Sequence, residues 1–241
     1  MLYLVLGVAM KLKSKTYFIA GTDTDAGKTL SACGLLRRAD KEGLRTLAVK
    51  PVAAGAVEVD GKLRNDDALN LSAAINQPLS YEQLNPVVFA PPIAPHIAAA
   101  KENRRITASQ LAGYCRGVMM RPADMVLVEG AGGWRVPLSG RETMADLAVA
   151  LQAPVILVVG LKLGCINHAL LTVEAIQRDG LVLAGWIANQ IDAHMSHAAE
   201  NIDTLTQLIP APCLGVVPFL DDVEGGRDAS AFLDLSSLRV Q

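Results

Sequence analysis

The sequence has few aromatic residues, few cysteines and no long run of charges of one sign. Phe, Trp and Tyr make up 4% of the 241 residues, whereas apolar residues make up 51%. The core must therefore be built mostly from Ala, Val, Leu and Ile, which favours parallel strands buried on both faces over a β-sandwich. The formal net charge is −2, and this balance argues against nucleic-acid binding, which relies on a concentrated basic surface.

The four cysteines, Cys33, Cys115, Cys165 and Cys213, lie far apart in the chain. They form no C-x-x-C pair and have no metal-ligand spacing, so they are typical of isolated thiols in a reducing compartment. We therefore expect a cytoplasmic protein.

The first ten residues, MLYLVLGVAM, are apolar but fall short of the ~20 residues that a membrane-spanning helix needs. Lysines follow this run, at Lys11, Lys13 and Lys15, whereas a signal peptide carries its charges before it. We expect no membrane association. We expect residues 1–14 to form an extension outside the fold, with translation from Met10 as one hypothesis, and residues 15–241 to form a single α/β domain.

Strand-like and helix-like segments alternate along the chain. This order predicts a mostly parallel, doubly wound sheet with helices on both faces. The expected strands are 16–21, 45–52, 124–133, 153–160, 181–189 and 212–220. The expected helices are 28–43, 66–75, part of 85–102, a helix capped by Thr107, 168–180 and 196–209.

The stretch AGTDTDAGKTLS (20–31) follows the first expected strand and opens the first expected helix. A strand, a glycine-containing turn and a helix starting at Lys28 and Thr29 form the arrangement that cradles phosphates, because backbone N–H groups and the helix dipole favour an anion there. A generic phosphate loop has four residues between its glycines, but five separate Gly21 from Gly27. The alternative is an ordinary helix start with an incidental Gly-Lys-Thr.

Charged residues follow two of the expected strands. Glu129 lies at the carboxyl end of the strand part 125–128, where open α/β sheets bind ligands; it is a candidate for a metal ligand or for a turn cap. Lys50 also ends a strand and could neutralise charge on a transferring phosphoryl group, or could be a surface lysine before a proline. Asp66 and Asp67 are candidates for the metal or for helix-dipole partners.

Together these motifs resemble the ATP-dependent dethiobiotin synthetase family, from about Thr16 to about Leu220. The resemblance includes the five-residue interval in the phosphate loop. The residues after Leu220 do not align with the family pattern. The motifs that carry the resemblance are GTDTDAGKT (21–29), KPVAAG (50–55), LRNDDA (63–68), VEGAGGW (128–134), VVGLKLGCINHALLT (158–172) and GWIAN (185–189).

The resemblance implies a reaction of 7,8-diaminopelargonate with CO2 and MgATP. An amine of the substrate captures CO2 as a carbamate, ATP phosphorylates the carbamate, and the second amine closes the ureido ring. The products are dethiobiotin, ADP and phosphate. Phosphoryl transfer of this kind depends mainly on positioning and charge stabilisation.

The resemblance also implies the residues of the site. Lys50, Lys28 and Thr24 would be catalytic, and Thr29, Asp67 and Glu129 would hold Mg2+. ATP would be bound by these residues and by Asp25, Ala26, Gly27, Leu30, Gly130, Ala131, Gly132, Asn189, Gln190, Pro218, Phe219 and Leu220. The diamine would contact Thr24, Ala54, Gly132, Cys165, Ile166 and Asn167.

Two further points come from the resemblance. In the family, the helix start at 165–167 is offered across a homodimer interface to the distal carboxylate of the substrate, and a helix N-terminus suits a carboxylate. The family pattern near the catalytic lysine is often KPVASG, with a serine that contacts the substrate. This chain has Ala54 at that position, so one substrate hydrogen bond is missing or replaced.

Three alternatives stay open. A ParA/MinD-like ATPase switch would carry a signature lysine where this chain has Asp23. An amide-forming relative that acts on corrin carboxylates would need a glutaminase domain, for which the chain has no room. A diverged paralogue would keep the chemistry but change the substrate, and Ala54 is the hint in that direction.

Overall fold

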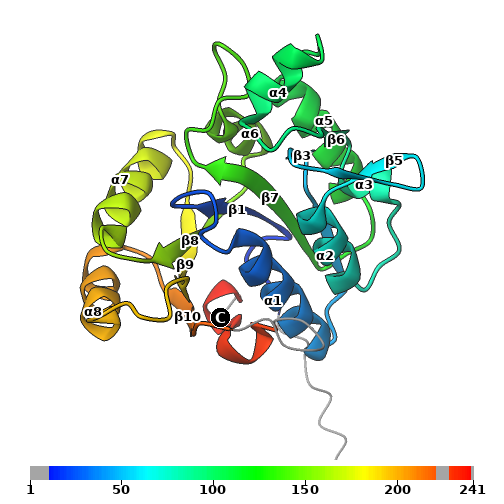
Figure 1. Ribbon diagram of the computed structural model, residues 1–241. Helices are drawn as coiled ribbons and strands as arrows, with labels where there is room; N and C mark the ends of the chain where they lie inside the picture. The colour runs from blue at the N-terminus through cyan, green and yellow to red at the C-terminus, as the bar shows by residue number, and fades with distance from the viewer. Residues whose placement is uncertain (1–10, 221–227, 240–241) are drawn as a thin grey trace, which may run out of the picture.

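The computed structural model describes residues 11–220 and 228–239. Its centre is a six-stranded sheet in the order β10-β9-β8-β1-β7-β2 (Figure 1). Every neighbouring pair in this sheet is parallel, which confirms the predicted fold class. The strands are β1 (Thr16–Gly21), β2 (Thr46–Val49), β7 (Met125–Gly133), β8 (Val155–Leu161), β9 (Leu183–Gln190) and β10 (Cys213–Val217).

The central strands are buried on both sides because helices cover both faces of the sheet. Along β1, Tyr17 and Ile19 pack into one cluster of buried residues, and Phe18 and Ala20 pack into the other. The first face is covered by α1 (Lys28–Lys41), α2 (Asp66–Ala74), α3 (Tyr81–Leu84) and the segment 228–239. The second face is covered by α4 (Pro95–Lys101), α5 (Ala108–Met119), α6 (Met144–Leu151), α7 (Cys165–Arg178) and α8 (Ala198–Leu208).

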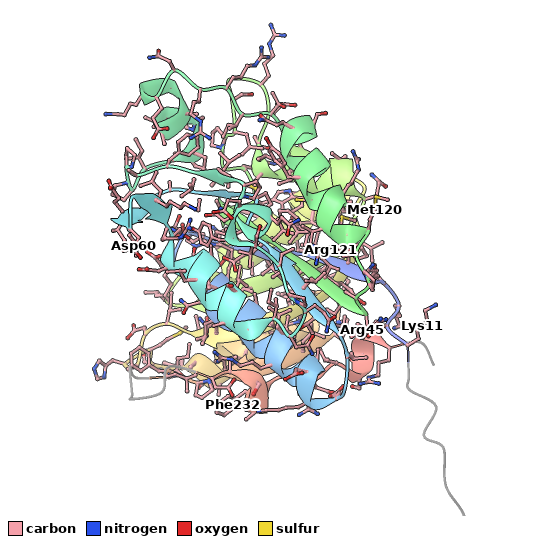
Figure 2. The ribbon with its side chains drawn as sticks, turned by 90° about the vertical axis from the view of Figure 1, so that its right-hand side faces the viewer. Lys11, Arg45, Asp60, Met120, Arg121 and Phe232 are labelled. Carbon is pink, nitrogen blue, oxygen red and sulfur yellow. The ribbon has the colours of Figure 1, made fainter. Side chains whose placement is uncertain are left out.

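Short elements lie beyond the carboxyl end of β2. A parallel pair is formed by β3 (Val52–Ala53) and β6 (Val87–Val88), and a hairpin is formed by β4 (Val57–Val59) and β5 (Lys62–Arg64). Figure 2 shows Asp60, in the turn of this hairpin, on the opposite side of the molecule from Arg45, which precedes β2. Near the C-terminus, η1 (Ser230–Phe232) and η2 (Ser236–Leu238) are single 3₁₀ turns.

The structure corrects several expected boundaries. The strand expected at 45–52 is two strands, because β2 ends at Val49 and the chain turns at Lys50 and Pro51 before β3. The helix expected from His168 begins at Cys165, directly after Gly164, which has a left-handed φ of 93°. Neither α6 nor the β4–β5 hairpin is among the expected elements.

Part of the expected N-terminal extension packs on the fold. Residues 1–10 lie outside the described part of the chain. Leu12 is buried and forms an antiparallel bridge with Arg239, and the backbone N–H of Lys13 donates to the carbonyl of Leu238 at 2.7 Å. Leu12 and Lys13 therefore contact the segment 228–239.

Candidate active site

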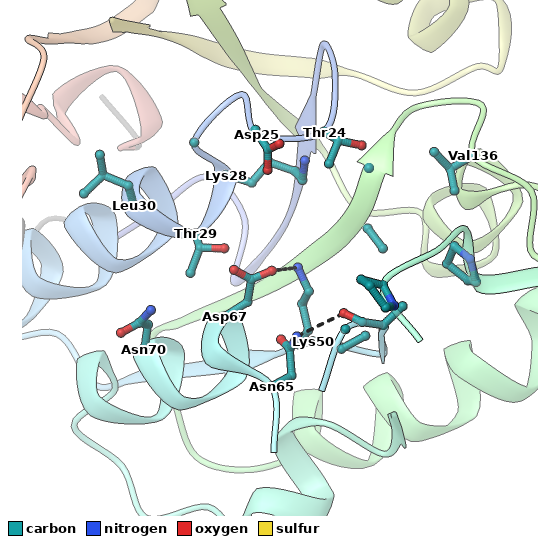
Figure 3. Close-up of a pocket in the computed structure, with 18 of the residues that line it drawn as sticks. Thr24, Asp25, Lys28, Thr29, Leu30, Lys50, Asn65, Asp67, Asn70 and Val136 are labelled. Carbon is teal, nitrogen blue, oxygen red and sulfur yellow. Dashed lines mark hydrogen bonds and ion pairs between the residues drawn. The ribbon is translucent and has the colours of Figure 1, made fainter. Parts of the chain in front are cut away.

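A cavity of about 980 Å³ opens at the carboxyl ends of β1, β2 and β7. Figure 3 shows that its labelled side chains come from the phosphate loop, from α1 and α2, and from the segments after β2 and β7. Many of the sequence-predicted residues line it: Thr24, Asp25, Gly27, Lys28, Thr29, Leu30, Lys50, Ala54, Asp67, Ala131 and Gly132. This is the edge at which parallel α/β sheets bind their ligands.

The phosphate loop is a tight turn between β1 and α1. Gly27 precedes the helix with a left-handed φ of 87°, and Asp25 also has a positive φ, of 57°. A Cβ on Gly27 would lie 2.0 Å from Nδ2 of Asn189. Only glycine fits at this position, since both the backbone conformation and the contact exclude a side chain.

The lysine of this loop is held by the loop itself. Lys28 is 7% exposed, and its Nζ donates to the backbone carbonyl of Asp23 at 3.0 Å. The carboxylate of Asp23 accepts a hydrogen bond from Nζ of Lys162 at 2.9 Å. Burial lowers the pKa of Lys28 and the nearby charge of Lys50 lowers it further, while the carboxylates around it oppose the shift.

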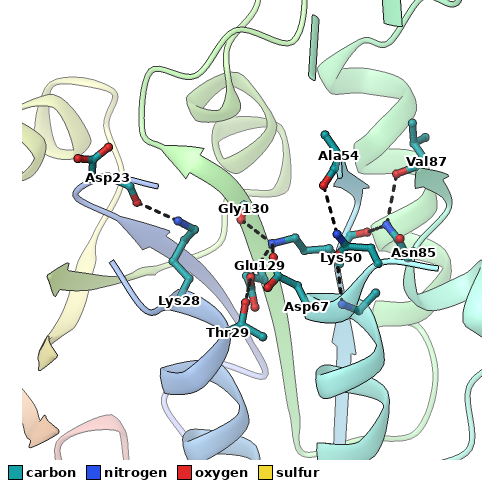
Figure 4. A network of polar contacts seen from close by, with 12 residues as sticks. Asp23, Lys28, Thr29, Lys50, Ala54, Asp67, Asn85, Val87, Glu129 and Gly130 are labelled. Carbon is teal, nitrogen blue, oxygen red and sulfur yellow. Dashed lines mark hydrogen bonds and ion pairs between the residues drawn. The ribbon is translucent and has the colours of Figure 1, made fainter. Parts of the chain in front are cut away.

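Lys50 lies at the centre of a polar network (Figure 4). Its Nζ donates to Oε1 of Glu129 at 2.6 Å and to Oδ2 of Asp67 at 2.8 Å. The hydroxyl of Thr29 also donates to Oε1 of Glu129, at 2.8 Å. The structure thus brings Lys50 together with Thr29, Asp67 and Glu129, the three residues predicted for the metal, although the four come from separate segments.

The charge state of this network follows from its contacts. Burial alone would lower the pKa of Lys50, but the charges of Glu129 and Asp67 and their hydrogen bonds raise it above its ordinary value. Burial would raise the pKa of Asp67, but Lys50 and Thr29 lower it overall. Both shifts favour the charged forms, an ammonium ion at Lys50 and a carboxylate at Asp67, and an ammonium ion can stabilise negative charge.

Two asparagines that the sequence analysis did not select support the network. The side-chain amide of Asn85 donates to the backbone carbonyl of Lys50 at 2.7 Å. The side chain of Asn65 accepts from the N–H of Ala68 at the start of α2, and it donates to the carbonyl of Ala54 at 3.2 Å. Asn65 lies in the LRNDDA motif, so its position before a helix was a signal for a cap.

A second cavity, of about 200 Å³, adjoins the phosphate loop at the other end of the site. Its lining includes Asp25, Gly27, Leu30, Asn189, Gln190, Phe219 and Leu220, all predicted to bind ATP, and Ile191, which was not predicted. The Nδ2 of Asn189 donates to the carbonyl of Ala26 at 3.0 Å, while its buried Oδ1 has no partner among the residues that the structure describes. This oxygen is an unsatisfied hydrogen-bond acceptor on a residue that lines the cavity.

The remaining predicted residues lie apart from both cavities or behind them. Glu129 is fully buried, and its Oε2 has no hydrogen-bond partner within residues 11–220 and 228–239. Gly130 and Ala26 contact the site through their carbonyls, to Lys50 and Asn189. Cys165, Ile166, Asn167 and Pro218 do not line either cavity of this chain. Cys165 is buried and Asn167 is exposed at the first turn of α7.

Two features of the described chain limit the kinds of site. Within residues 11–220 and 228–239, no three His, Cys, Asp or Glu side chains gather in a group that could hold a metal by themselves. Of the helices in these residues, none combines the length and the apolar character needed to span a bilayer.

All four cysteines are free, and burial beside Glu129 raises the pKa of Cys33 to about 12.

The fold and the loop define a class. Residues 15–227 match the family model described as "AAA domain". A signal recognition particle 54 kDa protein of Aeropyrum pernix, solved with GDP, superposes with a TM-score of 0.54 at 14% identity, over 92% of this chain and 44% of that one. A chain of a MinC:MinD complex of Aquifex aeolicus superposes with a TM-score of 0.52 at 15% identity, over 85% of this chain and 81% of that one. The chain is a P-loop nucleoside-triphosphatase-type protein in its fold.

Closer relatives define the family. The ATP-dependent dethiobiotin synthetase BioD of Cellvibrio japonicus is 59% identical over 227 residues, which cover 94% of this chain and 99% of that protein. The protein of the same name from Pseudomonas aeruginosa (strain UCBPP-PA14) is 52% identical over 224 residues, 93% of this chain and 98% of that one. The chain belongs to the ATP-dependent dethiobiotin synthetase family.

Proposed function

We propose that the protein catalyses the ATP-dependent ring closure of 7,8-diaminopelargonate with CO2 to dethiobiotin, a step of biotin biosynthesis. The observation that carries this proposal is the convergence of Lys28, Lys50 and Asp67 on one cavity beside a phosphate loop, with the buried Glu129 bonded to Lys50 behind them. Family membership supplies the reaction, and the cavity supplies groups of the kinds that the reaction needs.

The reaction has three bond-forming steps. One substrate amine attacks CO2 and loses a proton, which gives a carbamate. A carbamate oxygen then attacks the γ-phosphorus of ATP and ADP leaves, which gives a mixed anhydride. The second amine attacks the carbonyl carbon, loses a proton and expels phosphate, which closes the ureido ring.

Two ammonium groups would stabilise the charge that builds up in these steps. Lys28 lies on the phosphate loop and would turn from the carbonyl of Asp23 to the phosphates. Lys50 would face the carbamate, where a buried cation stabilises an anion more strongly than it could in water. The hydroxyl of Thr24 lies 3.5 Å from the place that a Cβ on Gly132 would take. Thr24 and Gly132 therefore lie close together at the side of the cavity where the reacting groups would meet.

The donors present fit a magnesium ion. Mg2+ is usually bound in nucleotide sites by one or two carboxylates together with waters and substrate phosphates. Thr29, Asp67 and Glu129 supply one hydroxyl and two carboxylates, and the unpartnered Oε2 of Glu129 is a buried acceptor. When bound, the ion would neutralise phosphate charge. These three residues would hold it.

The second cavity would hold the base. The unpartnered Oδ1 of Asn189 can accept a hydrogen bond from an exocyclic amino group such as that of adenine. Guanine and uracil carry a carbonyl oxygen in place of that amino group, and a carbonyl oxygen cannot donate to Oδ1. Gln190, Phe219 and Leu220 would flank the base, and Pro218 would fix their approach. Since ATP is used across the family, we propose ATP as the nucleotide.

We further propose a cytoplasmic homodimer in which residues 165–167 bind the distal carboxylate of the partner's substrate. These residues form the first turn of α7 and do not line this chain's own cavities, which supports a role toward another chain. Residues 15–241 would act as one domain, because β1, β2, β7, β8, β9 and β10 form one sheet and segment 228–239 packs on α1.

The test is an assay of phosphate release and product formation. Purified protein with MgATP and bicarbonate should release phosphate only when diaminopelargonate is added, and mass spectrometry should detect dethiobiotin. Phosphate release that does not depend on the diamine would refute the synthetase activity. Phosphate release with an altered diamine, and not with diaminopelargonate, would favour the diverged paralogue, for which Ala54 is the hint.

A further inference from the structure

We propose that Asp179, at the C-terminal end of α7, is a positioning residue that sets the affinity of the enzyme for its diamine substrate. It does so by fixing the segment Gly130–Val136, which we call the cavity wall. This inference rests on the proposed function, because the diamine is the ligand whose affinity is measured. Asp179 itself does not line either cavity.

The cavity wall has little room to move. Ala131, Gly132 and Val136 line the main cavity on the side of Thr24. Gly132 has a left-handed φ of 64°, and a Cβ there would lie 2.6 Å from Cγ2 of Val136 and 3.5 Å from Oγ1 of Thr24. A small displacement of the wall would therefore change the contacts of the groups that face the substrate.

The wall is not stiff by its own composition. Three of its seven residues are glycine: Gly130, Gly132 and Gly133. Glycine loses more backbone freedom on ordering than any other residue. Pairing with β1 reaches only to Gly133. Beyond that point, the wall depends on turn hydrogen bonds and on the side chains of Trp134 and Arg135.

Both of these side chains end on Asp179. The indole Nε1 of Trp134 donates to Oδ2 of Asp179 at 2.8 Å. The guanidinium of Arg135 contacts both carboxylate oxygens, at 2.8 Å and 2.9 Å. The Asp179 side chain is 18% exposed and Trp134 is 4% exposed, so these are charge-assisted bonds partly shielded from water, which are stronger than neutral ones.

The other contacts of Trp134 make it a rigid anchor. Its ring packs edge-on against Phe18 of β1, with centroids 6.0 Å apart and planes at 87°. Its backbone carbonyl accepts from the N–H of Ala145 at the start of α6, at 3.1 Å. Without Asp179, the buried indole N–H would have to move to find another acceptor, and the wall would move with it.

The primary experiment compares Michaelis constants. Asp179→Ala should raise the KM for the diamine about tenfold, because displacement of a positioned contact is costly. The KM for ATP should rise less, because ATP would also be held by Lys28 and the rest of the phosphate loop, whereas Asp179 bonds to Trp134 and Arg135. Asp179→Asn keeps an acceptor for Trp134 but loses the charge that pairs with Arg135. It should restore most of the affinity for the diamine.

The chain offers a matched control at the opposite end of the same strand. Asp124 precedes β7 and forms a two-bonded pair with Arg45, with both side-chain contacts at 2.9 Å. Asp124→Ala removes the same kind of pair far from the cavity. It should leave both KM values unchanged.

Trp134 provides a binding readout that does not depend on turnover. The chain has two tryptophans, so the Trp134→Phe variant reports Trp186 alone, and its spectrum can be subtracted. The emission of Trp134 should shift in Asp179→Ala. Titration with diamine, without ATP, should give a dissociation constant that rises about as much as the KM.

The outcomes separate the inference from the proposed function. If the wild-type protein shows no diamine-dependent phosphate release, the proposed function fails. If it does, and Asp179→Ala keeps a wild-type KM for the diamine, the inference is overturned. An equal rise in both KM values would also overturn it, as a general loss of structure. Should Asp179→Ala not fold, Arg135→Ala and Trp134→Phe must raise the diamine KM selectively, and otherwise the inference fails.

Discussion

Two ion pairs join β7 to the residues that flank β2, and the two pairs differ in burial. Before the first residue of β7, Asp124 pairs with Arg45, and their side chains are 37% and 52% exposed. In the middle of β7, Glu129 pairs with Lys50, which follows β2, and their side chains are 0% and 4% exposed. Residues 125–128, between Asp124 and Glu129, are all buried.

The difference separates a pair that joins strands from a pair that we propose takes part in chemistry. Water screens the Arg45–Asp124 pair, so it adds little to stability beyond fixing where the strands start. Lys50 and Glu129 have lost most of their hydration, an unfavourable change that the attraction within a buried ion pair often does not offset in full. The unpartnered Oε2 of Glu129 is consistent with such a ligand.

The largest expected effect is that of Lys50→Ala. Turnover should fall by at least about 10³-fold, because the variant lacks the buried cation that would face the reacting carbamate. The dissociation constant for ATP should stay within a few-fold of wild type, since Lys28 and the loop are intact. Steady-state assays measure turnover, and equilibrium binding titrations measure the dissociation constant for ATP. Unchanged turnover would remove Lys50 from the mechanism.

Glu129→Gln should have the next largest effect. The variant keeps an oxygen that can accept from Thr29 and Lys50 but loses the negative charge. Turnover should fall by about 10²-fold, and the magnesium concentration at half-maximal rate should rise. A magnesium titration of the steady-state rate checks both. A normal magnesium dependence would contradict the proposed metal role of Glu129.

Lys162→Ala tests an ion pair that lies at the site but is exposed. Lys162 and Asp23 are 40% and 49% exposed, and the pair holds the residue whose carbonyl binds Lys28. An exposed pair contributes little, so the KM for ATP should rise no more than about fivefold. In wild type, the KM for ATP should also depend on ionic strength more steeply than in the variant. Equal salt dependence would argue against this coupling.

Asp124→Asn should have the smallest effect. Its Tm at neutral pH should fall by at most about 3 °C, with turnover unchanged. The Arg45 guanidinium lowers the pKa of Asp124 to about 2, so the stabilisation is present above the unfolded pKa of about 3.9 and is lost as the pH falls toward about 2. The Tm difference between wild type and variant should shrink over that range. A difference that grows on acidification would refute this account.

Much of the fold and part of the site could be predicted from the sequence. Alternating buried strands and glycine-stopped helices are local patterns, so the parallel sheet was predicted with small boundary errors. The phosphate loop was predicted because its residues are contiguous, from Gly21 to Thr29. Lys50 and Glu129 were selected because each ends a strand, and strand ends in a parallel sheet meet at one edge.

The supporting contacts could not be predicted in this way. Asn85 and Lys50 are 35 residues apart, and Asp179 and Trp134 are 45 residues apart. No local periodicity encodes which side chains meet across such distances. The helix α6 was missed because its apolar sequence, MADLAVAL, resembles a buried strand as much as a buried helix.

The position of β1 has a consequence for how the protein is made. β1 lies between β7 and β8, so the strand that carries the phosphate loop has no partner in the sheet until residues up to Gly133 have been synthesised, and no second partner until residues up to Leu161 have followed. At ribosomal rates of about 5–20 residues per second, this leaves the first-made strand unpaired for on the order of ten seconds. A nascent chain therefore emerges with an exposed apolar strand, and nucleotide cannot be held until most of the polypeptide has left the ribosome.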